Sequence, residues 1–179
     1  MTKQSFSLIP CCDSDIPALQ CSGRVVRQNN FLSVQYSLLG EAGNIVLPAP
    51  STPPKRKDGL WATTCFEFFL ALPDDPQYWE FNLSPSGDWN VYHMDAYRRV
   101  GFREETSIQR LQFEVTNEAD CVLLNADVDL SPLISADHPI QLGFASVIQT
   151  IDRHQSYWAL AHLDSKADFH IRDSFLIHL

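Results

Sequence analysis

The chain has 179 residues, 45% of them hydrophobic and 11% aromatic, which is enough to bury one core and argues against a disordered protein. Its 13 basic and 22 acidic residues give a formal net charge of -9, which disfavours nucleic acid and membranes as partners. No apolar run approaches the ~20 residues that span a bilayer, and the N-terminus lacks the features of a secretory signal, so we expect a cytoplasmic protein.

Alternation of apolar and polar residues, which is typical of half-buried strands, dominates the chain after its first twenty or so residues. Strands are expected at 24–28, 31–39 and 45–47, separated by the turn sequences QNN and EAGN. The segment PAPSTPPKRKDG at 48–59 is too stiff and too poor in apolar groups for a regular element. We expect it to be a long surface loop whose basic run KRK is solvated.

After this loop the alternation continues to the C-terminus. It predicts strands at 60–72, 78–83, 90–95, 108–116, 121–128, 140–150, 157–162 and 174–178. Turn sequences such as PDDP and PSGD separate these strands, and helical periodicity is almost absent. We therefore predict one all-β domain over residues 1–179, built as a two-sheet antiparallel β-sandwich.

Neighbouring residues of a strand point to opposite faces, so the sequence also predicts which side chains are buried. The all-apolar sets, expected between the sheets, are Phe66, Phe68, Leu70 and Leu72 in one strand and Trp79, Phe81 and Leu83 in the next. The mixed sets are expected on a solvated outer face. There Glu67, Glu80 and Asn82 would lie together, with Trp61 at the rim.

Such a face has the residue types that bind a sugar. One face of a pyranose is apolar and stacks on an indole ring, while its hydroxyls pair with carboxylate, amide and guanidinium groups. The candidate ligand-binding residues are Trp61, Glu67, Glu80, Asn82, Trp89, Arg98 and Trp158. The alternative is a hydrated sheet face, with the tryptophans in the core or at its edge.

Catalysis and bound metals are not expected. Glu67 and Glu80 could meet the separation of about 5–9.5 Å that a glycosidase needs, but an open sheet face gives little desolvation to raise the pKa of an acid. The acidic turns lack a calcium loop, and five cysteines without a CxxC motif predict free thiols and no zinc site. We expect a non-catalytic protein without a cofactor.

Three segments, DGLWATTCFEFFLAL, YWEFNLSPSGDWNVYHMDAYR and VDLSPL, resemble DOMON-like domains related to family 9 carbohydrate-binding modules. The chain looks closest to a bacterial subgroup sometimes found beside a UDP-N-acetylenolpyruvoylglucosamine reductase. The resemblance runs from about Asp58 to the C-terminus.

The resemblance implies a jelly-roll β-sandwich that binds ligands and does not catalyse reactions. Relatives hold a sugar between two tryptophans, for which Trp61 and Trp158 are the matching positions here, or hold b-type haem between Met and His. Met94 matches the haem pair only loosely, and His93 beside it points to the opposite face. The expected ligand is thus a sugar or small polar molecule. The alternatives are a module that docks an enzyme partner, or a haem module.

Overall fold

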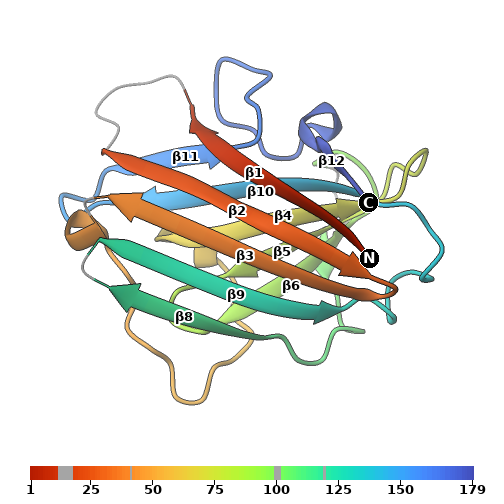
Figure 1. Cartoon of the computed structure of the whole chain (residues 1–179), viewed down its shortest axis with the longest axis horizontal. Helices are drawn as coiled ribbons and strands as arrows, with labels where there is room; N and C mark the ends of the chain where they lie inside the picture. Colours follow the sequence, from red (N-terminus) through yellow and green to blue (C-terminus); the bar gives the residue numbers. More distant parts are fainter. Residues whose placement is uncertain (12–17, 41, 99–101, 119) are drawn as a thin grey trace.

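Two antiparallel sheets lie face to face in the computed structural model, which describes residues 1–11, 18–40, 42–98, 102–118 and 120–179 (Figure 1). The front sheet contains β1 (Thr2–Pro10), β2 (Leu19–Gln28), β3 (Phe31–Gly40), β9 (Cys121–Asp129) and β8 (Gln112–Glu118). The back sheet contains β7 (Arg103–Glu104), β6 (Trp89–Met94), β5 (Tyr78–Leu83), β4 (Cys65–Ala71), β10 (Gln141–Gln149), β11 (Gln155–Ala159) and β12 (Ile177–His178). Three short 3-10 turns complete the described elements: η1 (Ala42–Asn44), η2 (Leu60–Ala62) and η3 (Arg172–Ser174).

Strand β1 joins the two sheets. Residues 2–8 pair with β2, whereas Ile9 and Pro10 pair with β11 of the back sheet. The hydrogen-bonded order therefore runs β7-β6-β5-β4-β10-β11-β1-β2-β3-β9-β8, with β12 paired to β10. The sandwich is one sheet curled over on itself, open at β7 and β8.

The inner faces of the two sheets enclose the main core. The back sheet contributes alternate residues of β4, β5 and β10, and the front sheet those of β2, β3 and β9. Phe68 stacks on Phe81 across β4 and β5, with ring centroids 4.2 Å apart, and Phe6 stacks on Phe144 across the sandwich at 4.1 Å. The all-apolar sets predicted for this core are in it, apart from Leu72, which packs partly buried against it.

The predicted all-β antiparallel sandwich of jelly-roll type is confirmed, and most predicted strands are present. Several predictions of local structure are wrong. The N-terminal strand β1 was not expected, residues 45–47 contribute only one bridge between Ile45 and Thr150, and Leu60–Ala62 form the turn η2 instead of the start of a strand. Of the strand expected at 174–178, only Ile177 and His178 are in a strand. Local propensity alone does not decide these cases, because a sheet is also stabilised by its neighbouring strands.

The proline-rich segment 48–59 is a loop, as predicted, and it is fixed to the back sheet. The Lys57 N–H donates to the Trp89 carbonyl at 2.9 Å, and the Trp89 N–H donates to the Lys55 carbonyl at 3.1 Å. The Ser51 N–H donates to the Ser86 carbonyl at 2.8 Å. The loop therefore holds η2 in a defined position before the N-terminal end of β4.

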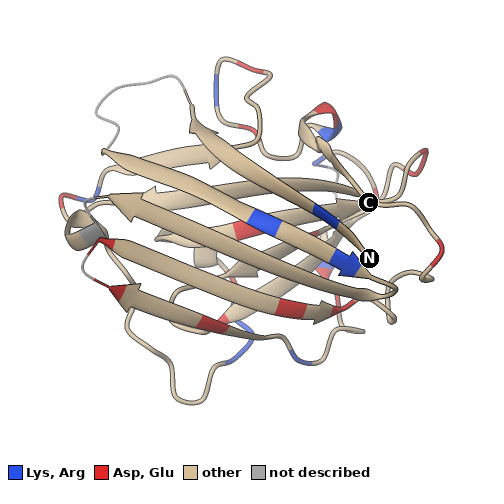
Figure 2. Ribbon diagram, in the orientation of Figure 1, with Lys and Arg blue, Asp and Glu red and all other residues tan. Residues whose placement is uncertain are grey.

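The strands of the front sheet carry charged residues of both signs (Figure 2). Lys and Arg lie on β1 and β2, while Asp and Glu lie on β8 and β9. No helix in the described part of the chain is long and apolar enough to cross a membrane. The outer face of the back sheet, in contrast, carries a second apolar cluster that includes Phe69, Tyr78, Tyr92 and Met94.

The four described cysteines, Cys11, Cys21, Cys65 and Cys121, are free thiols; Cys12 lies outside the described residues. Burial raises the pKa of Cys21 to about 12, and burial followed by the charge of Glu67 raises that of Cys65.

We expect iodoacetamide to label Cys21 and Cys65 at least about 100-fold more slowly in the native protein than after unfolding, because the thiolate is the reactive form. Peptide mass spectrometry would measure the rates. Native labelling of Cys65 as fast as that of half-buried Cys121 would contradict this prediction.

Candidate functional site

A cavity of about 900 Å³ lies on the outer face of the back sheet. Its floor comes from β4, β5, β6, β10 and β11, and its walls come from η2, from Arg98 and Phe102, and from the segment 167–170. The lining residues are Trp61, Ala62, Glu67, Glu80, Met94, Arg98, Phe102, Val147, Gln155, Tyr157, Ala167, Phe169 and His170. A space of this size suits a small-molecule ligand.

Trp61 stands on the wall of the cavity with 40% of its surface exposed. Gly59 adopts a left-handed φ of 71°, which favours glycine and turns the chain into η2. The Trp61 ring meets Tyr92 edge to face, with centroids 5.8 Å apart. Gln155 donates a 2.9 Å hydrogen bond to the Ala62 carbonyl, which ties η2 to β11. The ring is thus held in place with one side open.

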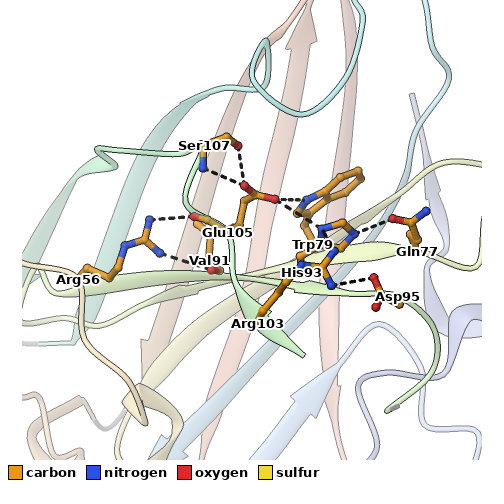
Figure 3. A network of polar contacts seen from close by, with 9 residues as sticks. All are labelled: Arg56, Gln77, Trp79, Val91, His93, Asp95, Arg103, Glu105 and Ser107. Atoms are coloured by element: carbon orange, nitrogen blue, oxygen red, sulfur yellow. Dashed lines mark hydrogen bonds and ion pairs between the residues drawn. The ribbon is translucent and has the colours of Figure 1, made fainter. Parts of the chain in front are cut away.

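Arg56 anchors the loop that carries Trp61, although the sequence suggested a solvated basic run. Its guanidinium donates to Asn90 Oδ1 at 2.6 Å. It also donates to the Glu105 carbonyl at 3.0 Å (Figure 3). It also lies over the Trp89 ring, 4.4 Å from the centroid. Trp89 is therefore buried between Arg56 and the core, so its expected role at the ligand is wrong.

The two glutamates form the polar part of the cavity floor. They come from adjacent strands, since Glu67 pairs with Asn82 and Glu80 with Phe69 in the register of β4 and β5. Only 3% of Glu67 and 6% of Glu80 is exposed, so the expectation of a freely hydrated face is wrong. The cavity walls and the second apolar cluster exclude most water from this part of the sheet.

Hydrogen bonding differs between the two carboxyl groups. Asn82 Nδ2 donates to Glu80 Oε1 at 2.7 Å, and the Cys65 thiol donates to Asn82 Oδ1 at 3.6 Å. Asn82 is fully buried beneath Glu80 and does not line the cavity, so it positions Glu80. In contrast, Glu67 Oε1 is buried without a hydrogen-bond partner.

Burial shifts both glutamates toward their neutral form. It raises the pKa of Glu80 from 4.5 to about 7, although the hydrogen bond from Asn82 and the charge of Arg98 act in the opposite direction. Burial, and next the charge of Glu80, raise the pKa of Glu67 well above its ordinary value. The sequence-based reason for dismissing a carboxyl pair as too well hydrated is therefore wrong.

His170 lies beside Glu80 on the wall of the cavity. Burial, and next the charge of Arg98, lower its pKa from 6.5 to about 4. Its Nδ1 lies 2.9 Å from the Tyr78 hydroxyl, and its Nε2 lies 3.9 Å from Glu80 Oε2. Between about pH 4 and pH 7 the proton thus resides on Glu80, and the contact joins two neutral groups.

Arg98, one of the candidate ligand-binding residues, lines the cavity, and its charge is compensated. Its guanidinium lies 3.0 Å from Asp168 Oδ1, while the Tyr97 hydroxyl donates to Asp168 Oδ2 at 2.6 Å. The backbone N–H of His170 also donates to Asp168 at 2.9 Å. Asp168 therefore connects the two wall segments of the cavity.

Four of the seven predicted site residues line this cavity: Trp61, Glu67, Glu80 and Arg98. Trp158 does not, and its expected pairing with Trp61 is wrong. Its ring points inward with 3% exposed, and its Nε1 donates to Ser156 Oγ at 2.9 Å. Tyr157, the preceding residue, faces the cavity instead, because alternate residues of β11 face opposite sides.

The residues present do not fit b-type haem. Met94 and His170 line the same cavity, which the sequence did not predict. However, Nδ1 of His170 is hydrogen-bonded to the Tyr78 hydroxyl, and Nε2 lies 3.9 Å from Glu80 Oε2, so neither ring nitrogen is presented to an iron. No group of three or more metal-binding side chains occurs within the residues that the structure describes.

Comparisons with known proteins bear on the fold. No protein-family model matches the chain, and no curated protein matches it. A candidate carbohydrate-binding protein from Bacteroides uniformis ATCC 8492 has a TM-score of 0.71 and 16% identity, over 96% of this chain and 83% of its own.

Two structures of a family 9 carbohydrate-binding module from Caldicellulosiruptor kristjanssonii are also similar. The glucose complex has a TM-score of 0.54 and 15% identity, over 90% of this chain and 75% of its own. The cellotriose complex has the same TM-score and identity, over 90% of this chain and 74% of its own. By its fold, this chain is an antiparallel β-sandwich similar to family 9 carbohydrate-binding modules.

Proposed function

We propose that this protein binds a sugar or sugar-like small molecule in the back-sheet cavity and does not transform it. The observation that carries the proposal is the open Trp61 ring, held beside buried carboxyl groups at the edge of a cavity of about 900 Å³. An indole stacks on the apolar face of a pyranose, while carboxyl and guanidinium groups pair with its hydroxyls.

The structural neighbours support this choice of ligand class. One neighbour is described as a candidate carbohydrate-binding protein, and the family 9 module was solved with glucose and with cellotriose. The cavity lies within the range of roughly 300–1,000 Å³ that small-molecule sites occupy. Tyr157 and Phe102, both half-exposed, offer further ring surface at the mouth.

The test is isothermal titration calorimetry against a panel of mono- and disaccharides, with cellotriose included. Saturable binding of at least one sugar supports the proposal. If no sugar in a broad panel binds, the exposed rings of the mouth would be better explained by a protein partner. Absorbance at about 400 nm in the purified protein would instead identify a haem protein.

Replacing Trp61 by alanine should weaken the bound sugar by at least about tenfold, because the stacking surface is lost. The free energy of unfolding should change by less than about 1 kcal/mol, because much of the ring is already hydrated. Calorimetry and chemical denaturation measure the two quantities. Phe31→Ala is the matched control, since Phe31 is an exposed ring on β3 of the front sheet and should leave binding unchanged. Equal sugar affinity in Trp61→Ala and wild type would rule out a stacking role.

A further inference from the structure

We propose that the cavity selects a cationic ligand: it takes a protonated or quaternary amine and, among sugars, prefers an amino sugar to its neutral parent. The preference for amino sugars rests on the proposed function. The preference for positive charge stands on the geometry of the cavity, and it can be tested with a cation that is not a sugar.

The first argument is the balance of charge among the described residues that line the cavity. Two carboxyl groups, Glu67 and Glu80, lie on the floor, and Arg98 is the one cationic side chain in that lining. Arg98 is paired with Asp168 at 3.0 Å, so its charge is already compensated. His170 is neutral at about pH 6, because burial and the charge of Arg98 lower its pKa to about 4. The floor therefore offers two ionisable carboxyl groups without a cation to match them.

The second argument is the unsatisfied state of Glu67. Its Oε1 atom is buried and has no hydrogen-bond partner, although its neighbour Glu80 is held by Asn82. A buried carboxyl oxygen without a partner costs free energy, and more so when the group is ionised. An ammonium group in the cavity would donate a hydrogen bond to this oxygen, and it would also compensate the negative charge of the ionised carboxylate. A neutral hydroxyl would supply only the donor.

The third argument is the chemistry of the walls. Four aromatic rings line the cavity, and the described lining has few other polar groups. The rings are Trp61, Phe102, Tyr157 and Phe169. The face of an aromatic ring attracts a cation, and this attraction grows when water is excluded. Rings around a carboxyl floor thus form a site suited to an alkylammonium or aminopyranose head.

Binding of a cation should release a proton. Burial and the charge of Glu80 keep Glu67 protonated at pH values where a free glutamate is ionised, and an adjacent ammonium would reverse this. Several other groups face the pair from the surrounding elements: Tyr36 from β3, Cys65 from β4, Tyr78 from β5, Tyr92 from β6, and Arg98, Asp168 and His170 from the walls. Of these groups, only His170 and Asp168 are expected to titrate below neutral pH.

Two matched pairs of probes test the proposal by calorimetry at about pH 6, where an aliphatic amine is protonated. Choline and 3,3-dimethylbutan-1-ol share one shape and differ by one positive charge. Glucosamine and glucose differ by an ammonium group in place of a hydroxyl. We expect the charged member of each pair to bind at least about tenfold more tightly. Repeating the choline titration in two buffers of different ionisation enthalpy should reveal proton release, which the neutral alcohol should not cause.

The outcomes separate this inference from the proposed function. Glucose binding as tightly as glucosamine, with no binding of choline, overturns the inference and leaves the sugar site. Choline binding without any sugar overturns the sugar function and leaves the cation site. Binding of none of the four probes, nor of any sugar in the panel, overturns both.

A pair of variants tests whether Glu67 causes the preference for a cationic ligand. Glu67→Gln keeps the shape of the side chain and should remove most of the difference between choline and its neutral analogue. Glu114→Gln, which removes an exposed carboxyl from β8 in the other sheet, should retain that difference. An unchanged preference in folded Glu67→Gln would overturn the role of Glu67. If this variant does not fold, the wild-type probe pairs still decide the proposal.

Discussion

Replacing Trp79 by alanine is expected to lower the free energy of unfolding by about 3–5 kcal/mol. The ring is 9% exposed and belongs to the core between the sheets. Its Nε1 donates to Glu105 Oε2 at 3.1 Å, and its ring lies beside that of His93 with centroids 5.1 Å apart (Figure 3). Alanine would leave a large void that strands on both sides cannot fill. Urea denaturation followed by fluorescence or circular dichroism measures the change.

Two further variants separate the causes of this loss. Trp79→Phe keeps most of the packing and removes the indole donor, so it should cost about 1–2 kcal/mol. Trp61→Ala makes the same change as Trp79→Ala at an open position and should cost far less. A larger loss of stability in Trp61→Ala than in Trp79→Ala would mean that the two faces of the back sheet have been exchanged.

The alternation of apolar and polar residues was sufficient to predict the fold class and the inner face of the back sheet. Phe66, Phe68, Trp79 and Phe81 all point into the predicted core. The reason is physical: a strand has a period of two, so one correct contact fixes the face of every other residue in it. Strand β1 was not predicted, although residues 2–8 pair with β2, the next strand in the chain, and only Ile9 and Pro10 pair with the distant β11.

The candidate site was only partly predictable, because its walls come from segments without a periodic pattern. The alternation placed Glu67 and Glu80 together on the outer face, which is where they lie. Their burial depends on Trp61, Phe169 and other wall residues, whose approach is set by tertiary contacts such as those of Asp168. Predicting which face of a strand a residue occupies therefore could not distinguish a hydrated surface from a cavity floor.

The choice between Trp158 and Tyr157 shows a second limit. The sequence offers two adjacent aromatic residues, and only one of them can face the cavity. Resemblance favoured the tryptophan. The register of β11 against β10, with Trp158 opposite Ser146 and Tyr157 opposite Val147, puts the tyrosine on the cavity side. Arg56 illustrates the same limit, since its partners Asn90 and Glu105 are far along the chain.

The second large effect concerns pH, because two neighbouring groups have folded-state pKa values shifted in opposite directions. The pKa of Glu80 is raised to about 7, so the folded state holds more protons than the unfolded state between about pH 4.5 and 7. Its contribution to stability is therefore lost as the pH rises through this range. The pKa of His170 is lowered to about 4, so stability is instead lost as the pH falls from about 6.5 to 4. In the wild type these two effects largely cancel.

Replacing either residue should expose the effect of the other. Glu80→Gln keeps an acceptor for Asn82 and removes the carboxyl group. Relative to wild type, this variant should gain about 3 kcal/mol of stability between pH 4.5 and 8, because the cost of ionising a buried carboxyl is gone. His170→Gln should show the opposite trend and gain about 3 kcal/mol relative to wild type as the pH falls from 7 to 4. Urea denaturation at several pH values measures both differences.

The difference between each variant and wild type is the quantity to compare, because titrating groups remote from the cavity floor cancel from it. Glu67 does not cancel for Glu80→Gln, since this variant also removes the charge that raises the pKa of Glu67. The two slopes should have opposite signs, and each should lie within the pH window of the group that was removed. If the difference for Glu80→Gln were constant from pH 4.5 to 8, water would reach this carboxyl in the folded protein. The cavity floor would then be hydrated. The proposal that a cationic ligand compensates buried carboxyl groups on this floor would lose its basis.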